Sequence, residues 1–446
     1  MKKLVRHTLL LMAATLTVAA CTGVSDVAET PVHEHVDEPQ AVNFSAYVNR
    51  GTTRGGYQGT LSLESLKLDG VGFGVFAYYT DNHVYSQTML PNFMYNQQVT
   101  WDGTTSSWTY TPIKYWPNET GDNGATTTDR LSFFAYAPYT AVDISTGRAT
   151  TNPTSGIVAL TRPSDSGDPV VRYYASWNPS EAVDLCWSNT NNFDKTKPAL
   201  SETVSFNFQH ALSALNVQID ADVDEAAHDG SNDVDSYTRI YVRSITFRGF
   251  ADRGQLNLNN TETTPRWNNL DCDCDLTSDA ITIYDGRRDD REGIAASLNE
   301  TKVGLNPVIV QSVPYTLDGG SAWGNIAYVT AGVTNTSVNL FNSSTASAPI
   351  FVIPTNEPLY VTIVYDVETY DPKLTSQYLS DGRTHGSTIE NNLSAYIKNG
   401  SSENIIMQAG KQYNIRLHLG MTSVKVDAEV TPWNNTYPDP DVNVPE

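Results

Sequence analysis

The chain has 446 residues, enough for two ordinary domains that each bury a core of their own. Its 50 acidic residues outnumber its 28 basic residues and give a formal net charge of −22. A surface of that sign repels nucleic acid and anionic lipid head groups, so we exclude both as direct partners.

The first 20 residues are ordered like a secretory signal. Three positively charged residues precede an almost wholly small or apolar run over residues 9–20, and small residues stand before Cys21. The run is shorter than the roughly 18 to 20 residues that a membrane-spanning helix needs. We therefore predict a signal peptide over residues 1–20, whose removal leaves 25 basic against 50 acidic residues.

Residues 18–21, VAAC, resemble a bacterial lipobox. In such a motif the signal peptidase cuts before the cysteine, so Cys21 would be acylated on its thiol and its new amine. Several acyl chains, at about 0.8 kcal/mol per buried CH₂, give nearly permanent membrane attachment. The alternative is an ordinary signal peptide whose cysteine is incidental. Residues 21–40 are polar and acidic, a composition that does not fold, and we predict a flexible tether.

Apolar and polar residues alternate over residues 41–48, the period of a half-buried strand. The apolar positions are Val42, Phe44, Ala46 and Val48. A glycine-rich segment that carries Arg50 and Arg54 follows, and exposed segments of small and polar residues are where proteases cut most readily. The sequence thus predicts either a first strand with a plain loop, or a strand that a trypsin-like protease removes by cutting after Arg54 or Arg50.

Short segments rich in β-branched and aromatic residues follow about every ten residues, with Gly, Asn and Pro between them. They occupy residues 71–79, 92–99, 108–110, 114–117 and 131–139. Such spacing is typical of a β-sandwich and differs from alternating β and α units. The sequence predicts an all-β fold with little helix.

Four blocks in this region read FGVFAY at 73–78, NFMYN at 92–96, YTPIKYWP at 110–117 and FFAYAPY at 133–139. In this order they resemble the fimbrillin family of the Bacteroidales, which comprises major and minor fimbrial subunits and related surface lipoproteins. The resemblance implies two tandem β-sandwich domains with transthyretin-like Greek-key topology.

Residues 141–200 are rich in loops and prolines, and their sequence leaves open whether residues 173–187 hold a short helix or a strand. Residues 204–219 resemble the segment that opens the second domain of fimbrillins. Their His210 has no serine, cysteine or carboxylate motif beside it, so we interpret it as a packed histidine bonded to the backbone. We place the domain boundary near residue 200, and the expected parts are an N-terminal domain over 41–200, a C-terminal domain over 201–435 and an acidic tail over 436–446.

Further strands are predicted in the second domain. They cover residues 239–250, 280–284, 308–313, 350–354, 359–367 and 412–419. In the first of them Ile240, Val242 and Phe247 are expected to face inward, as in a half-solvated antiparallel strand. Residues 410–415 and 424–433 resemble the closing strands and terminal tryptophan of fimbrillins, so the resemblance spans about 44 to 435.

No catalytic, metal-binding or cofactor-binding pattern is found, and we predict none of the three. Acidic residues alternate over 229–235 like half of a calcium loop, but the required Gly and bidentate Glu are missing; residues 271–275 are another acidic cluster. Cysteines with zinc spacing are absent, and a disulfide of Cys186 with Cys272 or Cys274 stays open. Nothing selects the pair of carboxylates that a glycosidase needs, so we predict that the chain is not an enzyme.

The resemblance implies assembly by strand exchange. An arginine-specific protease would cut at Arg54 or Arg50 and remove the strand over 41–48, and a strand of another subunit would fill the groove. Unpaired backbone groups at a sheet edge favour such strand addition. The candidate donor positions are Val424, Val426, Ala428 and Val430.

We therefore predict a fimbrial subunit or fimbria-associated surface lipoprotein that mediates adhesion. Its expected partners are other fimbrial subunits, the protease and outer-membrane lipid through Cys21, and its expected location is the cell surface. The alternative is a lipoprotein that does not polymerise and binds a glycan or a host ligand through exposed aromatic side chains.

Overall fold

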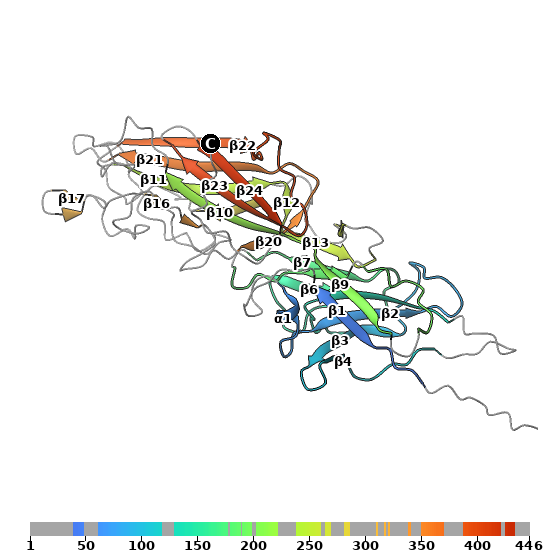
Figure 1. Ribbon diagram of the computed structural model, residues 1–446. Helices are drawn as coiled ribbons and strands as arrows, with labels where there is room; N and C mark the ends of the chain where they lie inside the picture. Colours follow the sequence, from blue (N-terminus) through green and yellow to red (C-terminus); the bar gives the residue numbers. More distant parts are fainter. Residues whose placement is uncertain are drawn as a thin grey trace, which may run out of the picture. The chain divides into compact units, whose positions relative to one another are not determined.

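The computed structural model is built almost wholly of β-strands (Figure 1). It describes residues 39–48, 61–117, 129–176, 179–188, 190–198, 202–221, 238–259, 264–268, 281–285, 309–310, 316–317, 320–321, 338–339, 349–369, 387–420 and 424–432. By its contacts the chain divides after Pro39, and the elements described below all belong to the unit Gln40–Glu446. Among the described residues the single helix is α1 (Leu63–Leu66), so the prediction of an all-β fold with little helix is confirmed. No helix in these ranges is long and apolar enough to cross a membrane.

The first sheet has seven strands in the order β1-β9-β8-β5-β2-β3-β4. Their bounds are β1 (Phe44–Val48), β9 (Val204–His210), β8 (Cys186–Ser188), β5 (Leu131–Ala137), β2 (Phe73–Tyr79), β3 (Met94–Asp102) and β4 (Ser107–Thr109). β1 runs parallel to β9, whereas the other neighbours are antiparallel. The two outermost strands, β1 and β4, also lie against each other, so the sheet curls around one of its faces.

The centre of this sheet is apolar on both faces. In β2, Phe73 and Val75 enter one buried cluster while Phe76 and Tyr78 enter another. An uninterrupted apolar run is what a strand covered on both sides requires. We call the cluster inside the curl the Phe44 cluster. It includes Val42, Phe44, Phe73, Phe133, Phe206 and Phe208.

A second sheet covers the other face in the order β14-β13-β7-β6. Its strands are β14 (Arg266–Asn268), β13 (Arg253–Asn257), β7 (Val170–Tyr174) and β6 (Gly156–Leu160). Tyr173 of β7 and Leu256 of β13 share the buried cluster that contains Phe76 and Tyr78. The segment whose structure the sequence left open, residues 173–187, therefore holds the end of β7 and the start of β8 and no helix in its described part.

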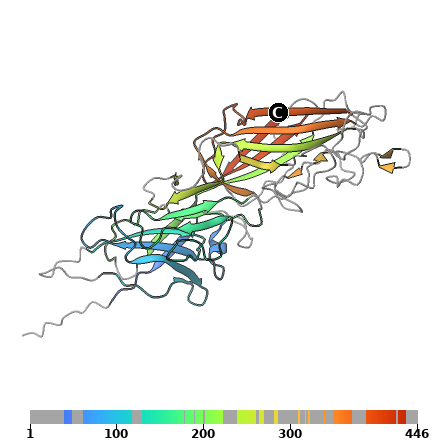
Figure 2. The same ribbon diagram turned by 180° about the vertical axis from the view of Figure 1, so that it is seen from behind.

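Two further sheets enclose another core. One has the order β12-β20-β10-β23-β24, with β19 beside β10, and the other the order β15-β11-β21-β22, with β16 beside β11 (Figures 1 and 2). The strands of the first are β12 (Phe250–Ala251), β20 (Ile350–Pro354), β10 (Ser213–Ala221), β23 (Lys411–Leu419), β24 (Val424–Pro432) and β19 (Val338–Asn339). Those of the second are β15 (Ile281–Asp285), β11 (Thr238–Arg248), β21 (Tyr360–Thr369), β22 (Ser387–Tyr396) and β16 (Ile309–Val310). A short hairpin joins β17 (Thr316–Leu317) to β18 (Gly320–Ser321).

The predicted run over residues 204–219 forms two strands. β9 ends at His210 and β10 begins at Ser213, and the linking residues Ala211 and Leu212 are fully buried. β9 belongs to the seven-stranded sheet and β10 to the sheet with β23. The domain boundary near residue 200 stays a prediction; β9, which follows it, pairs with β1 and β8, and β13 pairs with β7.

Candidate functional site

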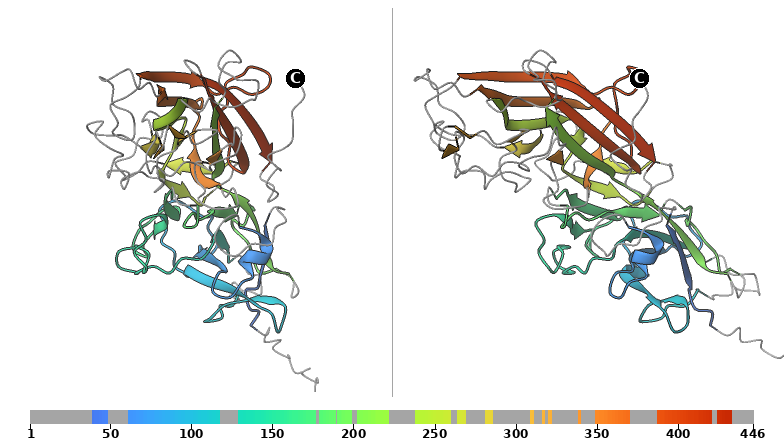
Figure 3. Two further views of the ribbon diagram at one scale, coloured as in Figure 1. Left: turned by 90° about the vertical axis from the view of Figure 1, so that its left-hand side faces the viewer. Right: turned by 60° about the vertical axis from the view of Figure 1, so that its left-hand side comes forward.

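β1 is the outermost strand of the seven-stranded sheet, and β9 is its neighbour in the order (Figure 3). The parallel register runs from Phe44 opposite Val204 to Val48 opposite Phe208. β1 itself has a ladder on one side only, so its departure breaks the ladder with β9 and the few hydrogen bonds that join residues 40–42 to residues 114–116. The strand exposed by its departure would then present unpaired N–H and C=O groups, which are a template for another strand.

The side chains of β1 alternate as the sequence predicts. Val42, Phe44 and Val48 are at most 4% exposed, and Ala46 packs against the Phe44 cluster from a partly buried position. Tyr47 points the other way and is 47% exposed. One row of β1 side chains is therefore part of the core, although the strand itself is at the edge.

Phe44 lies among three aromatic rings. Its ring centroid is 5.3 Å from that of Tyr110, 6.0 Å from Phe133 and 5.6 Å from Phe206. The ring planes are tilted or perpendicular to one another, the arrangement that aromatic quadrupoles favour. Phe44 is thus the largest anchor that β1 places in the core.

Backbone hydrogen bonds hold the residues just before β1 on the side that faces away from β9. Val42 N–H donates to the carbonyl of Lys114 (2.9 Å), and Trp116 N–H donates to the carbonyl of Gln40 (2.9 Å). The hydroxyl of Tyr110 donates to the carbonyl of Val42 (2.8 Å). On the β9 side, Val204 N–H donates to the carbonyl of Asn43 (2.8 Å). The segment is therefore fixed between β9 and residues 114–116.

The same hydroxyl of Tyr110 accepts from Lys114 N–H (3.2 Å), so replacing Tyr110 with phenylalanine should remove both bonds and keep the ring beside Phe44. We expect the free energy of unfolding to fall by about 1 to 2 kcal/mol, because each neutral hydrogen bond has a usual net value of about 1 kcal/mol. Urea denaturation followed by tryptophan fluorescence measures it, because Trp108 and Trp116 belong to or pack against the Phe44 cluster. A loss above about 3 kcal/mol would show that the ring had moved as well.

The other predicted positions at this end of the chain lie outside the described residues. They are Cys21, Arg50 and Arg54. The description resumes at Leu61, which is buried in the Phe44 cluster. Ser62 then caps α1 through a hydrogen bond from Ser65 N–H, and α1 contacts β1.

The candidate donor strand is part of its own sheet in the structure. β24 pairs antiparallel with β23, from Leu419 opposite Val424 to Lys411 opposite Pro432, and it stands at the end of the sheet order. The donor positions Val424, Val426 and Ala428 are partly buried, and Val430 is 41% exposed. The apolar row of β24 is therefore covered less completely than that of β1.

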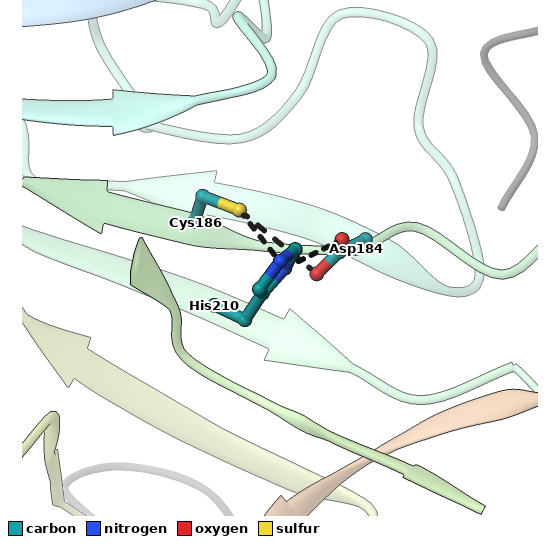
Figure 4. Close-up of side chains that lie close together, drawn as sticks. All are labelled: Asp184, Cys186 and His210. Carbon is teal, nitrogen blue, oxygen red and sulfur yellow. Dashed lines mark hydrogen bonds and ion pairs between the residues drawn. The ribbon is translucent and has the colours of Figure 1, made fainter. Parts of the chain in front are cut away.

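The structure also joins three side chains that the sequence did not connect (Figure 4). His210 Nδ1 lies 2.9 Å from Asp184 Oδ2 and 3.5 Å from Cys186 Sγ. Cys186 faces His210 across the β8–β9 pair, and Asp184 precedes β8. His210 is buried as predicted, but it bonds to a carboxylate as well as packing in the core. His210 is 24 residues from Cys186 and 26 residues from Asp184 in the sequence, so no local motif could reveal the cluster.

Asp184 has a further role in this cluster. Leu61 N–H donates to the same Oδ2 at 2.7 Å, and the carboxylate is only 2% exposed. Because an ionised carboxylate only accepts, Nδ1 of His210 carries a proton in this pairing. Asp184 thus ties the chain that follows residues 49–60 to the end of β9.

The chemistry of the cluster does not resemble that of a nucleophile site. Burial raises the pKa of the Cys186 thiol well above its usual value, and the charge of Asp184 raises it further, so the thiol stays protonated near neutral pH. Cys186 is a free thiol. Cysteine, histidine and aspartate are zinc ligands, and their donor atoms here lie within 4.8 Å of one another. Within the described ranges no fourth ligand of these types joins them, and the absence of a metal site stays a prediction.

The chain is similar to known proteins both in sequence and in fold. A family model described as fimbrillin-like matches residues 68–433. A fimbrium subunit, Fim1C, from Phocaeicola vulgatus is 29% identical over 223 residues, which cover 48% of this chain and 52% of that protein. The chain thus aligns with about half the length of this curated relative. The crystal structure of a fimbrial protein from Bacteroides vulgatus has a TM-score of 0.52 at 20% identity, and the match covers 89% of this chain and 100% of the other, which shows a shared fold.

Proposed function

Because the chain belongs to the fimbrillin-like family, we propose that it is a structural subunit of a fimbria, or a fimbria-associated surface lipoprotein, that serves in adhesion. The observation that carries this proposal is β1, an edge strand whose apolar row is buried among the aromatic rings of the Phe44 cluster. The relative Fim1C, a fimbrium subunit, supports it. The same family membership favours a structural protein over an enzyme.

The proposed assembly is strand exchange. An arginine-specific protease cuts after Arg54, or after Arg50, and the strand over residues 41–48 is released. Its loss opens an apolar groove along β9, and a strand from another subunit enters it. The positions Val424, Val426, Ala428 and Val430 of β24 are the proposed donor row.

The proposed location follows from the start of the chain. Acylation of Cys21 after removal of residues 1–20 would hold the precursor at the outer membrane. Proteolysis beyond Val48 would remove the covalent link between the subunit and that anchor, so that release of β1 then opens the groove and frees the subunit for the fimbria.

Limited trypsin digestion of a lipid-free chain beginning at residue 22 tests the proposal. We expect a new N-terminus at Gly55 or Gly51, followed by growth of multimers that resist denaturant, read by N-terminal sequencing and size-exclusion chromatography. An Arg50→Ala, Arg54→Ala double variant is the matched control and should stay a monomer. A chain that is cut at these positions and remains monomeric would contradict polymerisation and favour a free-standing binding lipoprotein.

A further inference from the structure

β1 and β24 carry nearly the same row of side chains at alternate positions of the strand. Read from the N-terminus, β1 and the residues before it present Val42, Phe44, Ala46 and Val48, and β24 presents Val424, Val426, Ala428 and Val430. Aligned in this order, the two rows are identical at three positions and differ only where Phe44 meets Val426. Lys425, Asp427 and Glu429 alternate with this row in the sequence, and Asp427 and Glu429 are exposed.

Building on the proposed strand exchange, we propose that β24 of a second copy of this chain enters the groove in one register, parallel to β9, with Val426 in the place of Phe44. In this register Val424, Ala428 and Val430 take the sites of Val42, Ala46 and Val48. The site of Phe44 is the one position that distinguishes the strand that leaves from the strand that enters.

The direction follows from the order of side-chain sizes. The reversed order puts Ala428 at the site of Phe44 and Val426 at the site of Ala46. The first change leaves a larger void and the second forces extra methyl groups into a filled place, and both are unfavourable in a close-packed core. In the parallel register alanine again fills the site of Ala46, and valine leaves a smaller void at the site of Phe44 than alanine does.

Two of the three rings around the Phe44 site also pack on rings outside β1. Phe206 lies 5.7 Å from Phe73, and Phe133 lies 5.8 Å from Trp116, whereas the hydroxyl of Tyr110 bonds to the carbonyl of Val42. Tyr110 follows β4, Phe133 belongs to β5 and Phe206 to β9. The walls formed by Phe133 and Phe206 should therefore stay in place when β1 leaves, and valine fills the space between them only in part.

The difference between Phe44 and Val426 determines which of the two strands binds the groove more tightly. A strand with phenylalanine at this site buries more apolar surface than one with valine, so β1 is the better ligand and β24 cannot displace it while the chain is intact. Cleavage followed by release of β1 takes the better ligand out of the groove. The second copy then enters with a strand that is only partly buried in its own sheet.

A peptide exchange experiment on the full chain tests this register. A sequence-specific protease site replaces residues 51–56, so that β1 stays bound after cleavage but is no longer covalently linked. Fluorescent peptides of residues 40–48 and 423–432 then compete for the groove, and fluorescence anisotropy gives their apparent Kd. We expect the β24 peptide to bind about tenfold to thirtyfold more weakly than the β1 peptide.

Substituted β24 peptides decide the register. A Val426→Phe peptide should recover the affinity of the β1 peptide to within about threefold, and a Val426→Asp peptide should lose binding by more than about a hundredfold. A Lys425→Phe peptide is the matched control, because it adds the same ring to the opposite face, and it should gain nothing. Equal gains from Lys425→Phe and Val426→Phe would overturn the proposed register.

The arms of this experiment separate the two proposals. Exchange of the β1 peptide together with failure of every β24 peptide would overturn the inference and leave strand exchange standing with another donor. Failure of the β1 peptide itself to exchange would overturn both.

Discussion

Replacing Asp184 with alanine is expected to lower the free energy of unfolding by about 2 to 5 kcal/mol. One buried oxygen of this carboxylate accepts from Leu61 N–H at 2.7 Å and lies 2.9 Å from His210 Nδ1. Removing it takes the acceptor from two buried donors at once, and each donor then carries its desolvation penalty. Urea denaturation followed by the fluorescence of Trp187, which is fully buried in β8, measures the loss.

Two further variants control for cavity formation. Asp184→Asn retains one acceptor oxygen for Leu61 N–H and should lose less than Asp184→Ala. Cys186→Ala removes the neighbouring thiol and should cost about 1 kcal/mol. If Cys186→Ala cost as much as Asp184→Ala, the three side chains would be acting as one unit. The expectation that the carboxylate contributes most of the cluster's stability would then be wrong.

Replacing Phe44 with alanine should cost about 3 to 5 kcal/mol, the range for removing a buried phenylalanine. The ring is 4% exposed and has three aromatic neighbours, two of which pack on further rings, so we expect the site to collapse little. The same change should shorten the time for which β1 stays bound once residues 49–60 are cut. Urea denaturation of the intact chain and the rate of release of β1 from the cut chain are the two measurements.

Tyr47→Ala is the matched control for Phe44, because it removes an aromatic ring from the same strand on its outer face. Tyr47 is 47% exposed, and its removal should change the stability by no more than about 0.5 kcal/mol. Comparable losses from the two variants would mean that β1 is held by its backbone alone and that the Phe44 site selects nothing.

Much of the fold could be predicted from periodicity. β2 has an uninterrupted apolar run, β5 is apolar apart from Ser132, and the structure buries both faces of each strand. β23 alternates apolar and polar residues, and the structure buries the apolar row. β11 shows why simple alternation can mislead. Val242, Ile245 and Phe247 all face the core although their positions differ in parity, because the pairing with β21 shifts between Val242 and Ser244.

Other features could not be read from local sequence. β22 is a ten-residue strand at the end of its sheet order with Ile389 45% exposed, and its polar sequence carries little apolar alternation. The parallel pairing of β1 with β9 and the meeting of Asp184, Cys186 and His210 depend on contacts between residues far apart in the chain. Sequence patterns report which side of a strand is buried, but they do not report which strand lies beside it.

The parallel pairing of β1 and β9 has a mechanical consequence. In the observed register, the N-terminal end of β1 and the C-terminal end of β9 lie at opposite ends of the ladder. A tensile force applied at these two ends pulls the strands past each other, and all the hydrogen bonds share the load at once. An antiparallel strand pulled at the same ends would be peeled away one bond at a time. A strand that enters in the orientation of β1 therefore makes a joint that resists tension, and only two buried residues separate that joint from β10 and the next sheet.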